Sequence, residues 1–139
     1  MYKKLLVAVD GSDISFKALD NAVVLAKATE GELWILHVDS STPEHQQHKR
    51  IGLVAEEPEL SCALLINKIL ETMNSAGVKF SVHTDTGNPS EVIVGAAEQN
   101  GCDTIVMGCR GLGGFTKLFL GSVSSEVINK AEIPVVIVK

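Results

Sequence analysis

The sequence predicts one α/β domain spanning residues 1–139, a doubly wound, open parallel sheet of five strands with helices on both faces. Three observations lead to this class. Four short apolar runs are largely continuous and not alternating, which is typical of strands buried on both faces of a parallel sheet. Helical patterns with start and stop signals separate these runs. The 139 residues are close to the length of one domain.

The expected strands follow one another in a simple order along the chain. The continuous runs lie at residues 4–9, 33–36, 104–107 and 135–138. A weaker run at residues 79–84 alternates between apolar and polar side chains, which indicates an edge strand with one wetter face. Five such strands usually take the order 3-2-1-4-5. The last strand therefore occupies the other edge.

Four helices are predicted from their capping residues. Their expected limits are Ser12 to Gly31, Pro58 to Gly77, Asn88 to Gly101, and Gly121-Ser122 onward. Leu64 in the second helix and Ile128 in the fourth are expected to point inward. Residues 39–57 form a long, polar, irregular connection.

Composition and charge exclude several classes of function. With 12 basic and 17 acidic residues the net charge is −5, which argues against a nucleic-acid partner. The first residues run directly into an apolar strand and then Asp10, so neither a signal peptide nor a membrane span is expected, and the predicted location is cytoplasmic. The three cysteines form no C-x-x-C pair, so no disulfide framework or zinc site is predicted.

Two unusual segments follow the first and fourth strands. Asp10-Gly11-Ser12 comes after the first, and five of the 12 glycines fall within residues 108–121 after the fourth. In the order 3-2-1-4-5 these strands are neighbours, and ligands bind beyond the carboxyl ends of strands where the order reverses. The two segments are therefore expected to face each other across one site.

The glycine segment is suited to phosphate. Glycines let backbone N–H groups approach an anion, and a helix beginning at Ser122 adds unpaired donors and a positive dipole end. The segment matches neither G-x-x-x-x-G-K-[ST] nor a G-x-G-x-x-G placed on the first strand. A surface loop without a ligand is the alternative interpretation.

At these residues the chain resembles the nucleotide-binding branch of the universal stress protein family. Gly108, Gly111, Gly121 and Ser122 match its signature G-x2-G-x9-G-[S/T] at full spacing. The resemblance extends over the whole chain, from the opening strand to Ile133-Pro134 and the last strand. Cys109 departs from the serine that many members have there.

The resemblance implies ATP as ligand, with Mg²⁺ or Mn²⁺ on the phosphates. The residues implied around the phosphates and ribose are Met107, Gly108, Arg110, Gly111, Gly113, Gly121, Ser122, Val123 and Ser124. Ala8, Asp10 and Val38 would hold the adenosine end, Val38 through its main chain. Asp10 could accept from a ribose hydroxyl or meet the cation, and the protein alone is not expected to hold a metal. The alternatives are a helix N-terminal acid for Asp10 and an N-cap for Ser122.

The function implied is an ATP-binding stress-response or regulatory protein, a switch with little or no turnover. No catalytic residue is predicted, because residues 108–125 contain no Glu, His or Gln to orient an attacking water. The alternative is a slow ATP hydrolase or an adenylate-forming enzyme of the related nucleotide-hydrolase superfamily. A homodimer is expected through the last strand, Val135, Val136, Ile137 and Val138, which is too apolar for an open edge.

Overall fold

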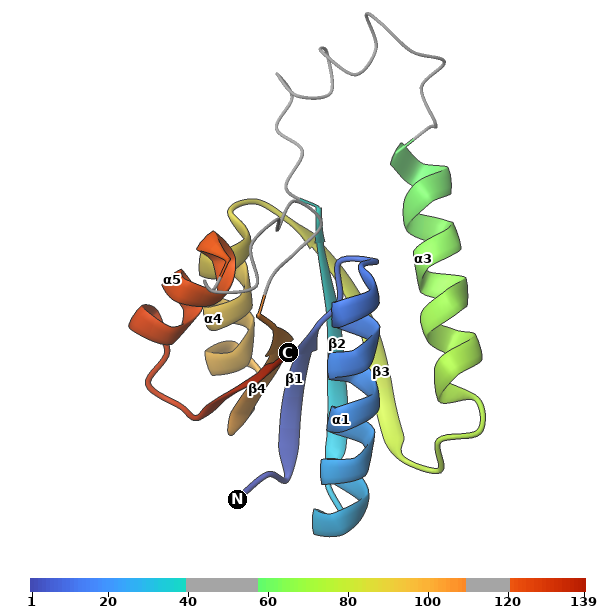
Figure 1. The fold of residues 1–139 in the computed structure, drawn as a ribbon, viewed down its shortest axis with the longest axis horizontal. Coiled ribbons are helices and arrows are strands. Elements are labelled where there is room, and N and C mark those ends of the chain that lie inside the picture. The colour runs from blue at the N-terminus through green and yellow to red at the C-terminus, as the bar shows by residue number, and fades with distance from the viewer. Residues whose placement is uncertain (40–57, 110–120) are drawn as a thin grey trace, which may run out of the picture.

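A computed structural model describes residues 1–39, 58–109 and 121–139, with the backbone alone at residues 58–61 (Figure 1). Strands and helices alternate along the chain. They are β1 (Lys4–Ala8), α1 (Asp13–Thr29), β2 (Glu32–Asp39), α3 (Pro58–Met73), β3 (Lys79–Thr86), α4 (Pro89–Gln99), β4 (Thr104–Gly108), α5 (Ser122–Lys130) and β5 (Val135–Val138). None of the helices in these described ranges is long and apolar enough to cross a membrane.

The five strands form one parallel sheet in the order β3-β2-β1-β4-β5, which confirms the predicted order. Val7 in the central strand pairs with Ile35 on one side and Val106 on the other. All three side chains are buried, as the continuous apolar runs predict. The alternating strand β3 lies at one edge and β5 at the other.

Two cores cover the two faces of the sheet, as expected for a doubly wound fold. On one face α1 and α3 pack on Leu5, Val7 and Ile35, with Leu19 and Ile69 among the buried helix residues. The helices α4 and α5 cover the other face. The buried residues of that core include Leu6, Leu36, Ile93, Ile105 and Val127. Figure 1 shows the two helix pairs on opposite sides of the sheet.

Two of the side chains expected to point inward do not. Leu64 is 61% exposed and Ile128 is 41% exposed. Leu65, Ile69 and Met73 contribute to the core instead, and their spacing of four residues defines a stripe that excludes Leu64. Ile128 follows the fully buried Val127, and neighbouring helix residues are rotated by about 100° from each other.

The end of α1 also differs from the prediction. The left-handed residue is Glu30, with φ 55°, and not Gly31. Gly31 is needed for a different reason, because a Cβ atom there would lie 2.6 Å from the carbonyl oxygen of Tyr2. This glycine lets the chain pass closely over the first residues before β2 begins.

Candidate functional site

The segments that follow β1 and β4 meet at the carboxyl ends of the parallel strands. We call this end of the sheet the carboxyl edge, and the opposite end the amino edge. A Cβ atom added to Gly108, the last residue of β4, would lie 2.9 Å from Cγ2 of Ile14 in the first turn of α1. Gly108 therefore allows α1 to begin directly against the end of β4. This packing is a structural reason for a glycine that the sequence analysis assigned to phosphate.

Asp10 organises the turn between β1 and α1. Its Oδ1 accepts from the backbone N–H of Ser12 at 2.9 Å and from the Ser12 hydroxyl at 2.5 Å. Ser12 is the N-cap of α1, and its hydroxyl oxygen accepts from the N–H of Ser15 at 3.2 Å. Asp10 thus supports the cap, in line with the alternative interpretation. Both bonds from Ser12 go to Oδ1, and neither involves Oδ2.

The start of α5 is held at the carboxyl end of β4. The N–H of Gly121 donates to the carbonyl oxygen of Cys109 at 2.7 Å, which brings together the two ends of the glycine segment. Gly121 is the N-cap and makes no side-chain capping bond, so the prediction of Ser122 as a possible N-cap is wrong. Ser122 is instead the first residue of the helix.

This arrangement leaves donors without helical acceptors. The N–H of Ser125 is bonded to the carbonyl oxygen of Gly121, one full turn back. The N–H groups of Ser122, Val123 and Ser124 precede that bond and have no acceptor within the helix. The helix therefore presents three N–H groups and the positive end of its dipole at this edge.

Gly121 does not have the positive φ that phosphate-binding glycines often adopt. Its φ of −67° and ψ of 164° are extended values that any L-residue can take. If a glycine is required here, the requirement is the space that a side chain would occupy.

Ser124 is fixed within the protein. The side chain is 2% exposed, and its hydroxyl lies 2.8 Å from the carbonyl oxygen of Cys109 and 3.0 Å from that of Gly121. The hydroxyl fastens α5 to β4, so Ser124 is available to a ligand through its backbone N–H only. Val123 is half-buried against the core beneath α5, and Met107 is buried in the same core.

The end of β2 presents backbone groups next to this helix terminus. The carbonyl oxygen of Leu36 accepts from the N–H of Val9 and therefore points toward β1. Since the peptide groups of alternate strand residues point to the same side, those of Val38 also point that way, but β1 ends at Ala8. Val38 thus directs main-chain groups past the end of β1. Ala8 packs on the same core as Val38.

His37 was not identified as a side chain of this edge from the sequence. Its Nδ1 lies 2.9 Å from the carbonyl oxygen of Val9. A carbonyl can only accept, so Nδ1 carries the hydrogen, and in the tautomer with its hydrogen on Nδ1 alone, Nε2 is an acceptor. A polar residue at the end of an apolar run is the sequence signal that points to it.

Three predicted site residues, Arg110, Gly111 and Gly113, lie outside the described residues. Within the described ranges, no group of three or more His, Cys, Asp or Glu side chains could hold a metal ion.

A doubly wound parallel sheet with a helix terminus at its carboxyl edge defines a class of α/β proteins that bind ligands at that edge. This chain belongs to the Universal stress protein family, whose family model matches residues 1–139. It is 36% identical to universal stress protein YxiE of Bacillus subtilis, over 100% of both chains. A solved structure of the protein MJ0577 is similar, with a TM-score of 0.78, 31% identity, and coverage of 100% of this chain and 96% of that chain.

Another solved structure, the universal stress protein from Archaeoglobus fulgidus in complex with dAMP, shares the fold. Its TM-score is 0.74 at 22% identity, covering 99% of this chain and 98% of that chain.

Proposed function

We propose that this chain binds ATP at the carboxyl edge of its sheet and acts as a nucleotide-dependent switch in stress response, with little or no turnover. The observation that carries the proposal is the bond from the Gly121 N–H to the Cys109 carbonyl. It sets the uncapped N-terminus of α5 beside the end of β4, where the spacing of Gly108, Gly121 and Ser122 matches a phosphate-binding signature.

Each part of the ligand has a candidate partner at this edge. The N–H groups of Ser122, Val123 and Ser124 would hold phosphate oxygens, together with Arg110, Gly111 and Gly113. The Asp10 Oδ2 would accept from a ribose hydroxyl while Oδ1 keeps the cap of α1. The peptide groups of Val38 would bind the edge of the adenine ring.

The cation would come with the nucleotide. Asp10 offers one carboxylate oxygen, and Mg²⁺ in nucleotide sites is usually held by one or two carboxylates, waters and phosphate oxygens. Mg²⁺ or Mn²⁺ would neutralise phosphate charge beside a carboxylate. An adenine nucleotide is the ligand of the Archaeoglobus fulgidus protein; at 22% identity this supports the proposal only as an analogy of fold.

Calorimetry on the wild type and Gly121→Val tests the site. We expect the wild type to bind Mg-ATP with a Kd of micromolar order, which corresponds to about −8 kcal/mol. Valine accepts the backbone angles of Gly121, so the variant should fold, but its side chain would stand where the phosphate approaches. Loss of binding with little change in Tm is the expected result. Wild-type affinity in the variant would exclude this helix terminus as the phosphate site.

His37 gives a specific reason to test a second function, slow ATP hydrolysis. Water attack needs a group that orients the water, and Nε2 of His37, in the tautomer with the hydrogen on Nδ1, would offer an acceptor at this edge. We expect phosphate release well below about 1 s⁻¹, the lower end of ordinary turnover. A rate above that value that disappears in His37→Ala would identify a hydrolase. Formation of AMP would instead indicate adenylate chemistry.

The proposed switch is a homodimer that pairs through β5. Within the described residues β5 pairs only with β4, which leaves one side of Val135–Val138 as a sheet edge. An apolar edge of this kind favours pairing with a second strand. Light scattering should give twice the monomer mass for the wild type and the monomer mass for Ile137→Lys. A monomeric wild type at micromolar concentration would contradict the dimer.

A further inference from the structure

A fully buried serine connects α4 to α5. Ser90 has no exposed surface, and its hydroxyl lies 2.9 Å from Oδ1 of Asn88 and 2.5 Å from Oε2 of Glu126. The Nζ of Lys130 donates to the same hydroxyl oxygen at 3.3 Å. A hydroxyl has one hydrogen, so Ser90 serves one of its two acceptors at a time. Residues 36 positions apart thus share a bond that is buried at Ser90 and partly exposed at Glu126.

One end of this network is attached to the end of β2. Asn88 is the N-cap of α4 and accepts from the N–H of Glu91 at 3.3 Å. The residue before it, Gly87, donates its N–H to the carbonyl oxygen of Asp39 at 3.2 Å. Asp39 follows Val38, so the network begins beside the peptide groups that are proposed to bind adenine.

The other end lies in α5. Glu126 is one turn beyond Ser122, in a helix of nine residues. The first turn of this helix is fastened to β4 by the bonds that Gly121 and Ser124 make to Cys109. Val127 anchors the underside of the helix in the core. The bond from Ser90 to Glu126 adds a hold on the side of α5 that faces α4.

We propose that Ser90 and Glu126 are positioning residues of the nucleotide site: their bond fixes α5 so that the N–H groups of its first turn face the phosphates. This inference rests on the proposed function. The Glu126 side chain is 50% exposed, but the Ser90 hydroxyl is fully buried, and a shift of α5 would replace its charged acceptor by the neutral Asn88. Hydrogen bonds to charged groups are the stronger ones, so the bond to Glu126 favours one arrangement of the two helices. A helix terminus binds an anion well only when several N–H groups converge on it.

Removal of the Glu126 carboxylate should change ATP affinity in opposite directions, depending on whether its charge or its bond to Ser90 matters. The carboxylate is negative and sits in the helix whose terminus would hold phosphate. On charge alone, its removal should strengthen ATP binding. If the bond to Ser90 positions the helix, its removal should weaken binding despite the lost repulsion.

Calorimetric Kd values for Mg-ATP on the wild type and four variants separate these effects. Glu126→Ala and Ser90→Ala should each weaken binding by roughly 3- to 30-fold, the usual range for residues that act through others. Glu126→Gln loses the same charge but keeps an oxygen that accepts from Ser90, so it should stay within about twofold of the wild type. The double variant Ser90→Ala/Glu126→Ala should be no weaker than the weaker single variant, since both remove one bond.

Two controls match the charge and the stability change. Lys130 pairs with Glu126 at 4.0 Å and with Glu91 at 3.8 Å. Glu91→Ala therefore removes a carboxylate that has the same cationic partner, but it leaves the bond from Ser90 to Glu126 in place. Thr104→Ala removes a fully buried hydroxyl that donates to Asp103, far from the carboxyl edge. Both should keep wild-type affinity, and Thr104→Ala should do so although its Tm falls.

The outcomes separate the two proposals. A wild type that does not bind ATP overturns the proposed function itself. A wild type that binds, with Glu126→Ala binding as tightly or more tightly, overturns the positioning. Equal weakening in Glu126→Gln and Glu126→Ala would also overturn it, because the loss would then not depend on an acceptor for Ser90. Weakening in Thr104→Ala would overturn it as well, because general stability would then explain the loss.

Discussion

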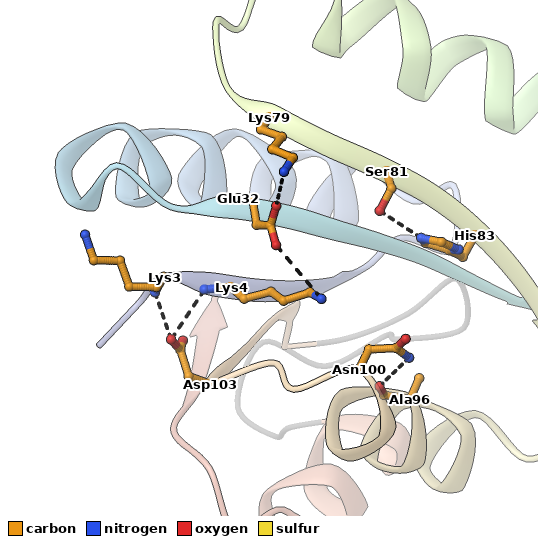
Figure 2. Close-up of polar contacts among 9 residues, drawn as sticks. All are labelled: Lys3, Lys4, Glu32, Lys79, Ser81, His83, Ala96, Asn100 and Asp103. Atoms are coloured by element: carbon orange, nitrogen blue, oxygen red, sulfur yellow. Dashed lines mark hydrogen bonds and ion pairs between the residues drawn. The ribbon is translucent and has the colours of Figure 1, made fainter.

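The amino ends of the strands and the start of α5, at the carboxyl ends, differ in whether side chains satisfy their backbone groups. At the amino edge Asp103 accepts from the N–H groups of Lys3 and Lys4 through Oδ2, at 2.8 and 3.3 Å (Figure 2). Glu32 pairs with Lys4 at 3.9 Å and with Lys79 at 3.3 Å, as Figure 2 also shows. At the carboxyl edge, a glycine caps α5 without a side chain and leaves three N–H groups free of helical acceptors.

This difference is the basis for the proposed location of the nucleotide site. Helices and strands present unpaired groups at both edges, so the fold alone does not decide where a ligand binds. At the amino edge Asp103 accepts from two strand N–H groups, and at the carboxyl edge Ser12 and Asn88 cap α1 and α4. No side chain caps α5, and the proposed function assigns the N–H groups of its first turn to an external acceptor.

The largest expected effect belongs to the amino edge. In Gly31→Ala the new Cβ would lie 2.6 Å from the carbonyl oxygen of Tyr2 and 3.0 Å from that of Lys3, and backbone atoms must move to make room. Overpacking of this kind costs roughly 1–3 kcal/mol of unfolding free energy. Urea denaturation measures the loss. ATP affinity of the folded variant should be unchanged, because the carboxyl edge is untouched.

Gly95→Ala is the matched control for this substitution. Gly95 lies within α4, and a Cβ there would meet nothing within 4 Å. Alanine in the middle of a helix should stabilise the protein by about 0.5–1 kcal/mol. If Gly31→Ala were as stable as Gly95→Ala, the close passage of the chain over Tyr2 would be wrong.

Asp103→Asn tests how the amino edge is satisfied, with a smaller effect. Burial opposes ionisation of Asp103, but the N–H groups of Lys3 and Lys4, the Thr104 hydroxyl and the charge of the N-terminus outweigh it and hold the pKa below the usual 3.8. The single amide oxygen of asparagine can take the place of Oδ2, but the variant loses the negative charge and the second oxygen, Oδ1, which accepts from the Thr104 hydroxyl, so it should lose roughly 1 kcal/mol at neutral pH.

The pH dependence of that loss has a fixed sign. A lowered folded-state pKa stabilises the protein above the unfolded value, and this stability is lost as pH falls through the folded-state pKa. The difference in unfolding free energy between the wild type and Asp103→Asn should therefore become smaller only below about pH 3.8. A difference that narrows already between pH 7 and pH 5 would point to another group.

The smallest expected effect is at His83, which lies in β3 between its amino and carboxyl ends. Its ring stacks on Trp34 with centroids 3.8 Å apart and an angle of 14° between the planes. Burial, and then the charge of Lys4, lower the pKa of His83 below 6.5. Stability from the neutral ring is present above pH 6.5 and declines as pH falls through the lower folded-state value. The effect is small because the ring is only partly buried.

Trp34 reports this titration directly, since it is the only tryptophan of the chain. Its fluorescence should change with a midpoint below pH 6.5, and His83→Gln should abolish the change. A midpoint at or above 6.5 would contradict the stacked, partly desolvated ring.

The sequence predicts the sheet well and the side-chain bonds of the site poorly. Apolar runs such as 104–107 are strands because both faces are buried, and that local pattern suffices to find the strands. Their order follows from the usual arrangement of five such strands. The spacing of Gly108 and Gly121 likewise marks the carboxyl edge. The bond from Ser90 to Glu126 depends on how α4 packs against α5, which local spacing does not encode.

The same limit explains the errors in the details. Leu64 and Leu65 are equally apolar neighbours, and only the packing of α3 decides which one is buried. Gly31 looks like a helix stop, but its requirement comes from the carbonyl of Tyr2, 29 residues earlier in the chain.

The most direct test of the account is an amide chemical-shift titration of the ¹⁵N-labelled protein with Mg-ATP. We expect the N–H signals of Ser122, Val123, Ser124 and Val38 to move together with a single micromolar-order Kd. The signals of Lys3, Lys4 and Glu32, at the amino edge, should stay in place. Shifts concentrated at the amino edge, or no shifts at millimolar ATP, would contradict the claim that the nucleotide binds at the carboxyl edge.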